Sequence, residues 1–594
     1  MNSRELILEG KLELPRQIVE LSGSEYATEM EAMFQAIWYN YLKNKGSISS
    51  VYWSDRFNNP VVFNKFVMHL SKAGWIESIV EPKRNWAEIR FNENKLDKWV
   101  TAKEVLKIRE QKKFIKYQLT DKADTVTNKV KTADGVKHTG LVREGFAKAS
   151  TVKFKYDTAM IEKYREAIEL NLTKSMRMLK LEYGIFTDTV DYLSISKAIL
   201  EYHMTNPDKE FCLEGNISDS RGRAIHKALG KVFNPISFKD ARALLVCEPK
   251  PLSLSGLINV YLAIAELLKL KPNTLKKKAA LGKEAYDNRT LPELDLDSEE
   301  DRKELHSLIL LERLYDALDN KRDCFDVMIE TDATASMLGI EGVLLNHKPF
   351  LEMTNLLGDT LSDAWSFNGI DRTQFKKAMT PLLYGSSKDC RTLWKQNKIS
   401  YDIAQVKAFN REIRHGALSV ADKFKSFIIN NVKPKEVMTV KIWDEEFQIM
   451  CNRYKNIGEY TKRYDVYSTK LGRVETIYHT HTKRVADLEQ FKRYFVTLLI
   501  HNLDSQIANR ICVEVDGVLP IHDAFLAHPN EISKVKEMYC QVINKIYANR
   551  DRILSDYFSS IGIDSKASVE WTELSRATQP VNNNTFSAQR TALK

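Results

Sequence analysis

The apolar content of this chain stays high from about residue 157 to about residue 572, and no internal repeat is apparent in that stretch. One hydrophobic core rarely serves more than about 150–250 residues, so a stretch of this length predicts several packed subdomains. The hydrophobic fraction of 43% is that of a folded protein. No run of about 18 uninterrupted apolar residues occurs, so the sequence predicts no membrane span.

The pattern divides the chain into four parts. We expect an N-terminal domain over residues 1–118, a linker or mobile loop over 119–156, a large core over 157–576 and a C-terminal tail over 577–594. The expected linker is rich in Lys, Thr and Asp and poor in large apolar residues. The tail is polar and contains a run of three asparagines.

The N-terminal domain combines helical spacing with a hairpin pattern. Apolar residues recur at helical spacing over 25–44 and near 61–73, and two alternating runs then flank the basic segment 81–85. Helices followed by a basic-tipped hairpin suggest a winged-helix-like unit that could touch DNA. A small structural subdomain with a solvated loop explains the same pattern.

The net charge and the cysteine pattern exclude only a few classes of protein and of binding site. The net charge of +10 is compatible with a nucleic-acid groove, but solvated surface lysines explain it equally well. The seven cysteines are scattered without a CxxC pair, which argues against a zinc site or a disulfide framework. The N-terminus also lacks the pattern of a secretory signal. We therefore expect a cytoplasmic protein with no membrane partner.

The first candidate catalytic carboxylate is Asp332. It follows the strand-like residues 327–331 and precedes a run of small residues, Ala333 to Ser336. An Asp at the end of a buried strand, followed by a turn of small residues, can place its carboxylate and a backbone carbonyl on one cation. An Asp that caps the next helix explains the pattern as readily.

The second candidate is Asp523. The apolar runs 518–521 and 524–527 flank His522-Asp523, which predicts a hairpin with the Asp at its tip. A buried His–Asp pair could also be a structural hydrogen bond. The two candidates gain meaning together, because two-metal phosphoryl transfer needs carboxylates from different strands that hold Mg²⁺ ions about 3.5–4 Å apart.

Between the carboxylates, residues 371–385 predict a helix suited to a triphosphate. Arg372, Lys376, Thr380 and Tyr384 recur every four residues. Each step advances about 40° around a helix, so the four side chains lie on one broad face. This face offers two cations and a phenol to one ligand.

Two other residues of this segment shape the expectation. Asp371 is placed to act as the N-cap or first-turn acid. Pro381 removes a hydrogen bond and clashes with the carbonyl of Lys377, so we expect a kink that separates the cationic half of the helix from Tyr384.

The order of these segments resembles motifs A, B and C of the single-subunit bacteriophage and mitochondrial RNA polymerases. The matches are Asp332 in DATAS, an R-x-x-x-K with Tyr-Gly eight residues after Lys376, and His522-Asp523-Ala-Phe. Residues 219–223 (DSRGR) look like the family's D-x-R-G-R element, which holds the template and the RNA–DNA hybrid. Residues 500–505 (IHNLDS) are similar to the histidine-bearing segment upstream of motif C. The resemblance covers roughly the C-terminal two-thirds of the chain.

The resemblance implies an α+β, mostly helical, right-hand polymerase of palm, fingers and thumb with an N-terminal domain. It implies a DNA-directed RNA polymerase that uses two Mg²⁺ ions, a DNA template and rNTPs to make an RNA product. By this resemblance, the metal ligands would be Asp332, Asp523 and the Ala333 carbonyl. Arg372 and Lys376 would bind the triphosphate, and Lys376 would protonate the leaving pyrophosphate. Tyr384 would lie beside the sugar, His501 near the 2′-hydroxyl, and Arg221 and Arg223 on the nucleic acid.

The sequence departs from the family at several points. Met337 stands where the family usually has Gly, and one extra residue before Tyr384 leaves open whether Lys376 or Lys377 is the motif lysine. The aromatic C-terminus of the family is absent. We identify no promoter-reading hairpin, although residues 439–478 contain strand-like pieces with basic and aromatic residues. The short form suggests an accessory protein for DNA opening.

Two other functions remain as alternatives. An A-family-like DNA polymerase or primase would be the nearest, but A-family DNA polymerases carry Glu at the positions of Met337 and Ala524, so both residues favour ribonucleotides. A non-catalytic DNA-binding replication accessory protein is the other. Such a protein has no need for both Asp332 and Asp523.

Overall fold

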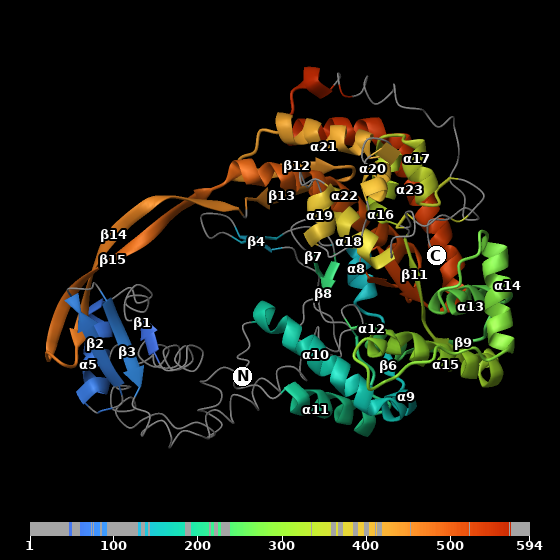
Figure 1. Cartoon of the computed structure of the whole chain (residues 1–594), viewed down its shortest axis with the longest axis horizontal. Helices are drawn as coiled ribbons and strands as arrows, with labels where there is room; N and C mark the ends of the chain where they lie inside the picture. Colours follow the sequence, from blue (N-terminus) through green and yellow to red (C-terminus); the bar gives the residue numbers. More distant parts are fainter. Residues whose placement is uncertain are drawn as a thin grey trace. The chain divides into compact units, whose positions relative to one another are not determined.

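The computed structural model describes a mixed α+β chain with more helix than strand (Figure 1). Among the described helices, none is both long enough and apolar enough to cross a membrane. The described residues are 47–49, 60–72, 74, 76–82, 86–91, 129–131, 137–139, 143–183, 192–212, 216–218, 224–226, 238–333, 335–357, 361, 364–365, 372–383, 390–396, 403–409, 411–412, 418–451, 453–521, 523–568 and 571.

The chain divides into two units. Unit 1 takes Met1–Ile115, Met176–Ile195 and Tyr454–Val485, and unit 2 takes the remainder. The elements of unit 1 are β1 (Ser47–Ser49), α5 (Pro60–Lys72), β2 (Ile76–Glu81), β3 (Trp86–Phe91), β14 (Tyr454–Ser468) and β15 (Arg473–Ala486). Helices α10 (Arg165–Tyr183) and α11 (Tyr192–Thr205) are divided between the units.

Unit 2 holds most of the helices. Its helices are α8 (Glu144–Ala149), α9 (Thr158–Lys163), α12 (Lys239–Ala243), α13 (Leu254–Leu267), α14 (Leu275–Asp287), α15 (Leu305–Asn320), α16 (Ser336–Leu344), α17 (Lys348–Met353), α18 (Arg372–Leu383), α19 (Cys390–Gln396), α20 (Ile403–Ala408), α21 (Ser419–Asn431), α22 (Leu488–Glu514) and α23 (Pro529–Ser560), with 3₁₀ turns η3 (Asp301–Glu304) and η4 (Arg322–Cys324). Its strands are β4 (Lys129–Lys131), β5 (Lys137–Thr139), β6 (Lys155–Tyr156), β7 (Asn216–Ser218), β8 (Ala224–His226), β9 (Leu245–Lys250), β10 (Phe325–Val327), β11 (Ile329–Asp332), β12 (Val437–Ile442), β13 (Glu445–Met450), β16 (Leu519–Ile521) and β17 (Ala524–Ala527).

The helix and hairpin predicted in the N-terminal domain are confirmed. Helix α5 is followed by β2 and β3, which pair antiparallel in a sheet of order β1-β3-β2. Three apolar residues of α5, Phe63, Val67 and Leu70, repeat at helical spacing and are buried. The helix predicted over 25–44 and the basic turn residues 83–85 lie outside the described residues.

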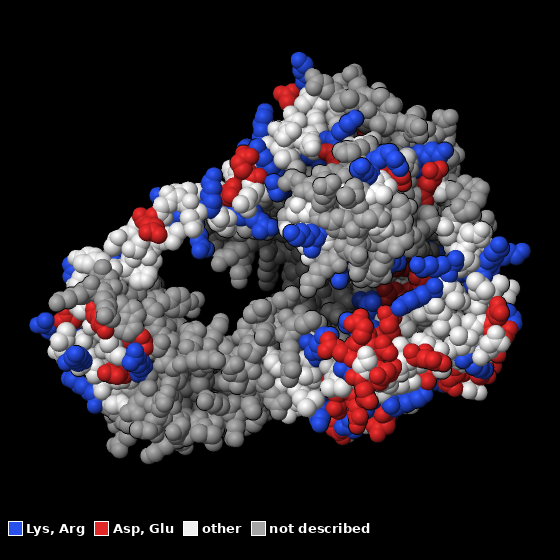
Figure 2. Space-filling view, viewed as in Figure 1, with Lys and Arg blue, Asp and Glu red and all other residues white. Residues whose placement is uncertain are grey.

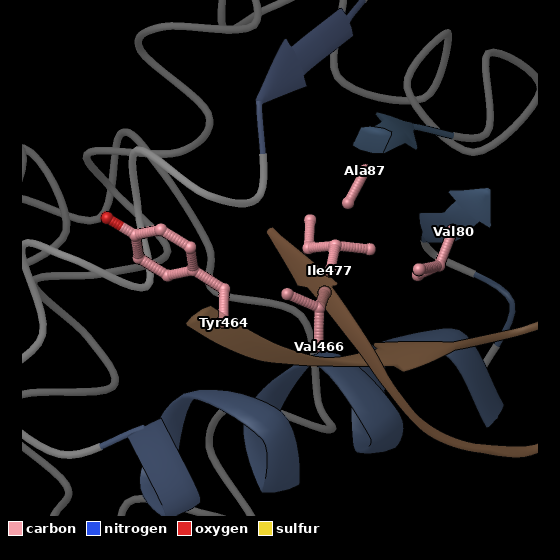
Figure 3. Packing of buried hydrophobic residues seen from close by; sticks show 5 residues of the cluster. All are labelled: Val80, Ala87, Tyr464, Val466 and Ile477. Carbon is pink, nitrogen blue, oxygen red and sulfur yellow. The ribbon is translucent and has the colours of Figure 1, made fainter. Parts of the chain in front are cut away.

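A long hairpin from the C-terminal half of the chain completes unit 1. Strands β14 and β15 pair with one another, and the half of the hairpin nearest its turn packs on β2 and β3 (Figure 3). The shared apolar cluster consists of Val80, Ala87, Tyr464, Val466 and Ile477. The N-terminal domain predicted as residues 1–118 therefore shares its core with a segment more than three hundred residues away in sequence.

Hydrogen bonds between the hairpin and the N-terminal segment reinforce this packing. Ser78 accepts from the Thr469 N–H at 2.9 Å, and its own N–H donates to the Thr469 hydroxyl at 2.7 Å. Asn64 of α5 donates to the Asp465 carbonyl and accepts from the Tyr467 N–H, both at 2.8 Å. Directional contacts of this kind fix the register of the hairpin on the small sheet.

The sheet β11-β17-β16 of unit 2 is packed among long helices. Both β16 and β17 are fully buried, and α23 contacts β17 while α22 contacts β16. Helix α22 is buried nearly all round from Phe495 to Ala508, as expected of a helix in the middle of a core. Asp487 caps its first turn by accepting from the Gln490 N–H.

The predicted linker over 119–156 is wrong at its C-terminal end. Helix α8 packs on α22 so closely that a Cβ added at Gly145 would lie 2.0 Å from the Asn509 carbonyl oxygen. Arg143 is buried, and it contacts the Glu445 carboxylate and the Ser505 hydroxyl. The segment was misread because small and polar residues suffice for packing where a helix approaches another backbone closely. The tail predicted over 577–594 lies outside the described residues.

Candidate active site

The two predicted carboxylates lie at the same end of one small sheet. Strand β11 pairs antiparallel with β17, with Asp332 opposite Ala524, and β16 pairs with β17 with Ile521 opposite Ala524. Residues 522 and 523 therefore connect β16 to β17 directly beside the end of β11. The Ala333 N–H donates to the Asp523 carbonyl at 3.3 Å, which ties the two turns together. The predicted hairpin with Asp523 at its tip is confirmed; His522 lies outside the described residues.

The backbone turns sharply after Asp332. Ala335, immediately before α16, has φ of 52° and ψ of 61°, a left-handed conformation. That conformation costs roughly 1–2 kcal/mol for a residue with a Cβ, and small side chains bear it best. The run of small residues after Asp332 thus serves a tight strand-to-helix turn.

The negative charges at this end of the sheet are poorly balanced by the protein. Asp332 retains an exposed face, but protein atoms crowd around its carboxyl group. This crowding, followed by the charges of Asp523 and Glu330, raises the pKa of Asp332 to about 8, whereas the charge of Lys376 lowers it. A bound cation would relieve this repulsion.

The donors present fit Mg²⁺. The two carboxylates and the Ala333 carbonyl are hard oxygen donors, and Mg²⁺ is commonly held by one or two carboxylates together with substrate phosphates and water. Within the described part of the chain, no cluster of three or more His, Cys, Asp or Glu side chains could hold a metal ion on its own.

Cation binding here should depend on pH. A carboxylate must be deprotonated to bind Mg²⁺ or Mn²⁺, and the raised pKa leaves part of the Asp332 population protonated near neutral pH. We expect Mn²⁺ affinity to rise between pH 6 and pH 9 with release of a proton on binding. Isothermal titration in two buffers of different ionisation enthalpy measures that proton, and Asp332→Asn should abolish its release. An affinity that is flat across this range would contradict the expectation.

The predicted phosphate helix is present as α18. Phe375, Met379 and Leu382 recur at helical spacing and are buried, whereas Arg372 and Lys376 are exposed on another face. The Lys376 ammonium lies 5.2 Å from the centre of the Trp365 ring, a cation–π contact that restrains the long side chain. Its charge also acts on Asp332, so α18 directs a cation toward the carboxylate end of the sheet.

The structure addresses two questions that the sequence left open in α18. The charge of Lys376 acts on Asp332, which makes Lys376 the better match to the motif lysine. Helix α18 continues through Pro381 and ends at Leu383, and the kink expected at Pro381 stays a prediction. The Thr380 hydroxyl donates to the Lys376 carbonyl at 2.7 Å, one turn back along the helix. Asp371 and Tyr384 lie outside the described residues.

Helix α22 carries His501 in its buried central part. Asp504, one turn further along α22, acts electrostatically on Tyr539 of α23, and so do Asp523 and Asp332. Burial and these negative charges raise the pKa of Tyr539. The histidine-bearing segment therefore belongs to a helix that reaches the neighbourhood of both carboxylates.

Sequence reasoning missed some contributors to the site. Tyr539, only 2% exposed, and Glu266 of α13 both interact electrostatically with Asp332. Neither lies in a recognisable motif; Tyr539 is buried, so helical periodicity could have marked it as inward-facing, whereas Glu266 is exposed and gave no such signal. The predicted nucleic-acid residues Arg221 and Arg223 lie outside the described residues, between the paired strands β7 and β8.

No protein-family model matches this chain, and a search of curated proteins finds no significant match to it.

Proposed function

We propose that this chain is a DNA-directed RNA polymerase that joins rNTPs on a DNA template by two-metal nucleotidyl transfer. The observation that carries the proposal is the pairing of β11 with β17, which brings Asp332 beside Asp523, together with the charge of Lys376 acting on Asp332. Two carboxylates that repel one another, with an exposed cationic helix nearby, suit a ligand made of Mg²⁺ and a triphosphate. The right-hand architecture of palm, fingers and thumb is part of this proposal.

Each residue would have a separate task. Asp332 and Asp523, with the Ala333 carbonyl, would hold the metal ions. When bound, the two Mg²⁺ ions would activate the attacking hydroxyl and stabilise the charge of the leaving pyrophosphate. Arg372 and Lys376 would orient the triphosphate, and Lys376 would give a proton to the pyrophosphate. Tyr384 and His501 would face the sugar, and Arg221 and Arg223 would hold nucleic acid.

The exposed half of the β14–β15 hairpin supports a nucleic-acid partner. Residues 454–463 are all exposed, and Tyr454 and Tyr460 lie among the basic residues Lys455, Lys462 and Arg463. Flat aromatic rings beside cations are the chemistry that bases and phosphates favour. Figure 2 shows Lys and Arg at intervals along this hairpin, while acidic side chains gather over the part of unit 2 that holds α9, α12 and α15. Phosphates would be repelled from that acidic face.

Two buried residues next to the carboxylates support the choice of ribonucleotides. Ala524 lies directly opposite Asp332 in the sheet, and Met337 lies in the first turn of α16. Both are buried apolar residues, and neither position carries the extra carboxylate that A-family DNA polymerases place there. With apolar residues at these two positions, no carboxylate would block the 2′-hydroxyl of a ribonucleotide.

Primer extension with rNTPs or dNTPs on a DNA template tests the proposed function. With Mg²⁺ present, we expect extension with rNTPs at least about tenfold faster than with dNTPs, a difference of about 1.4 kcal/mol in the activation free energy. Preferential use of dNTPs would indicate a DNA polymerase. Binding of DNA without incorporation of either substrate, with accessory proteins of the source supplied, would indicate a non-catalytic DNA-binding protein.

A further inference from the structure

A buried lysine–glutamate pair links the helix after Asp332 to the end of the nucleotide helix. Glu341 of α16 is fully buried, and Lys425 of α21 is 3% exposed. The Lys425 ammonium lies 3.8 Å from a Glu341 carboxylate oxygen and donates to the Leu382 carbonyl of α18 at 3.4 Å. Three elements that are separate in sequence therefore meet at one ammonium group.

Burying the Glu341–Lys425 pair costs desolvation free energy, which makes the pair a poor means of stabilising a core. Neither carboxylate oxygen of Glu341 accepts a hydrogen bond from a described residue, and 3.8 Å exceeds hydrogen-bond length. Burial raises the pKa of Glu341, the charge of Lys425 opposes that change, and Asp422 of α21 adds to it. Buried ion pairs with imperfect geometry are commonly no more stable than apolar residues of similar volume, so stability alone explains this pair poorly.

The hydrogen-bond acceptor of Lys425 shows which helix this lysine holds. Leu382 belongs to the last turn of α18, where backbone carbonyls have no partner within the helix. A cation at that end of a helix is favoured by the helix dipole. The same helix carries Arg372 and Lys376, and Tyr384 follows it directly. A contact at Leu382 therefore constrains the orientation of every nucleotide-facing residue predicted on α18.

We propose that Lys425, held by Glu341, is a positioning residue that fixes the C-terminal end of α18 against α16, and so holds the triphosphate cations in place relative to Asp332. This role rests on the proposed function of α18 in nucleotide binding. Lys425 itself is buried and takes no part in the chemistry.

The test is the double variant Lys425→Met, Glu341→Met, which removes both buried charges. We expect a Tm close to that of the parent, because no unpaired charge remains. Hydrogen–deuterium exchange should become at least about tenfold faster in peptides covering α18 but not in those covering α22. The KM for rNTPs should rise about tenfold, with DNA affinity unchanged.

The matched control is Arg313→Met. Arg313 is also a buried cation that pairs with a carboxylate, Asp157, and donates to backbone carbonyls, at Ala243 and Leu245. Loss of the Arg313 cation should lower the Tm but should not selectively accelerate hydrogen–deuterium exchange in peptides covering α18. A purely structural role for Lys425 predicts this same pattern for the double variant.

Native exchange in α18 with a native KM in a folded double variant would overturn the proposal. Should this variant fail to fold, Lys425→Gln, Glu341→Gln applies the same criterion, because it also removes both buried charges and shortens the side chain that donates to Leu382. The proposed function fails separately: if the parent protein incorporates no nucleotide but α18 is released in the variant, the positioning role stands and the polymerase assignment falls.

Discussion

Asp523→Asn is expected to lower the rate of nucleotide incorporation at least about a thousandfold while leaving DNA affinity unchanged. Asparagine keeps the size of the side chain, and the backbone carbonyl that accepts from Ala333 is unaffected. The β16–β17 hairpin should therefore form as before. The loss comes from removal of one of two carboxylates that hold the metals, worth about 4 kcal/mol of transition-state stabilisation at about 1.4 kcal/mol per tenfold in rate.

The matched control for this variant is Asp516→Asn. Asp516 precedes the same hairpin, but its side chain is 82% exposed and pairs with Lys148 at the surface. We expect activity within about twofold of the parent, since exposed ion pairs contribute little. Single-turnover extension and a filter-binding measurement of DNA affinity distinguish the two variants. Substantial incorporation by Asp523→Asn would remove Asp523 from the catalytic site.

Lys376→Gln is expected to reduce kcat/KM for rNTPs by about tenfold to a hundredfold. A charge-assisted hydrogen bond to phosphate contributes about 1.5–3 kcal/mol, and the same lysine would supply the proton to the leaving pyrophosphate. Because the charge of Lys376 lowers the pKa of Asp332, its removal should raise that pKa further. The acidic limb of the pH–rate profile should then move to higher pH.

The neighbouring lysine gives a direct comparison. Lys377 is exposed on the same helix, and surface substitutions usually have small effects, so Lys377→Gln should keep kcat/KM within about threefold of the parent. Steady-state kinetics across pH 6–9 for both variants decides between the two lysines. A larger loss in Lys377→Gln than in Lys376→Gln would transfer the motif role to Lys377.

Several elements were predictable because their signals are local. The alternation around residues 81–85 predicted β2 and β3, and the flanks of His522-Asp523 predicted β16 and β17. The four-residue spacing of Arg372, Lys376 and Thr380 predicted the helix that the structure shows as α18. In each case the pattern of side chains within one element decides which face can be buried.

Other features were not predictable, because they depend on how distant segments pack. The misread residues 143–156 look like a polar linker, yet Gly145 and Arg143 fit against α22 and β13. The hairpin β14–β15 was visible only as strand-like pieces, and its role in the core of unit 1 depends on Val80 and Ala87 far upstream. The composition of a segment does not show which distant residues it packs against.

Asp332 and Asp523 depend both on local sequence patterns and on tertiary packing. The sequence by itself determined that Asp332 ends a strand and that Asp523 lies at a hairpin tip, because alternation and turn residues specify these conformations locally. Only the tertiary structure decided that β11 pairs with β17 in the register that brings the two side chains together, that the charge of Lys376 acts on Asp332, and that Lys425 contacts both Glu341 and the Leu382 carbonyl of α18. These contacts depend on burial and register between residues far apart in the chain, which a local pattern does not encode.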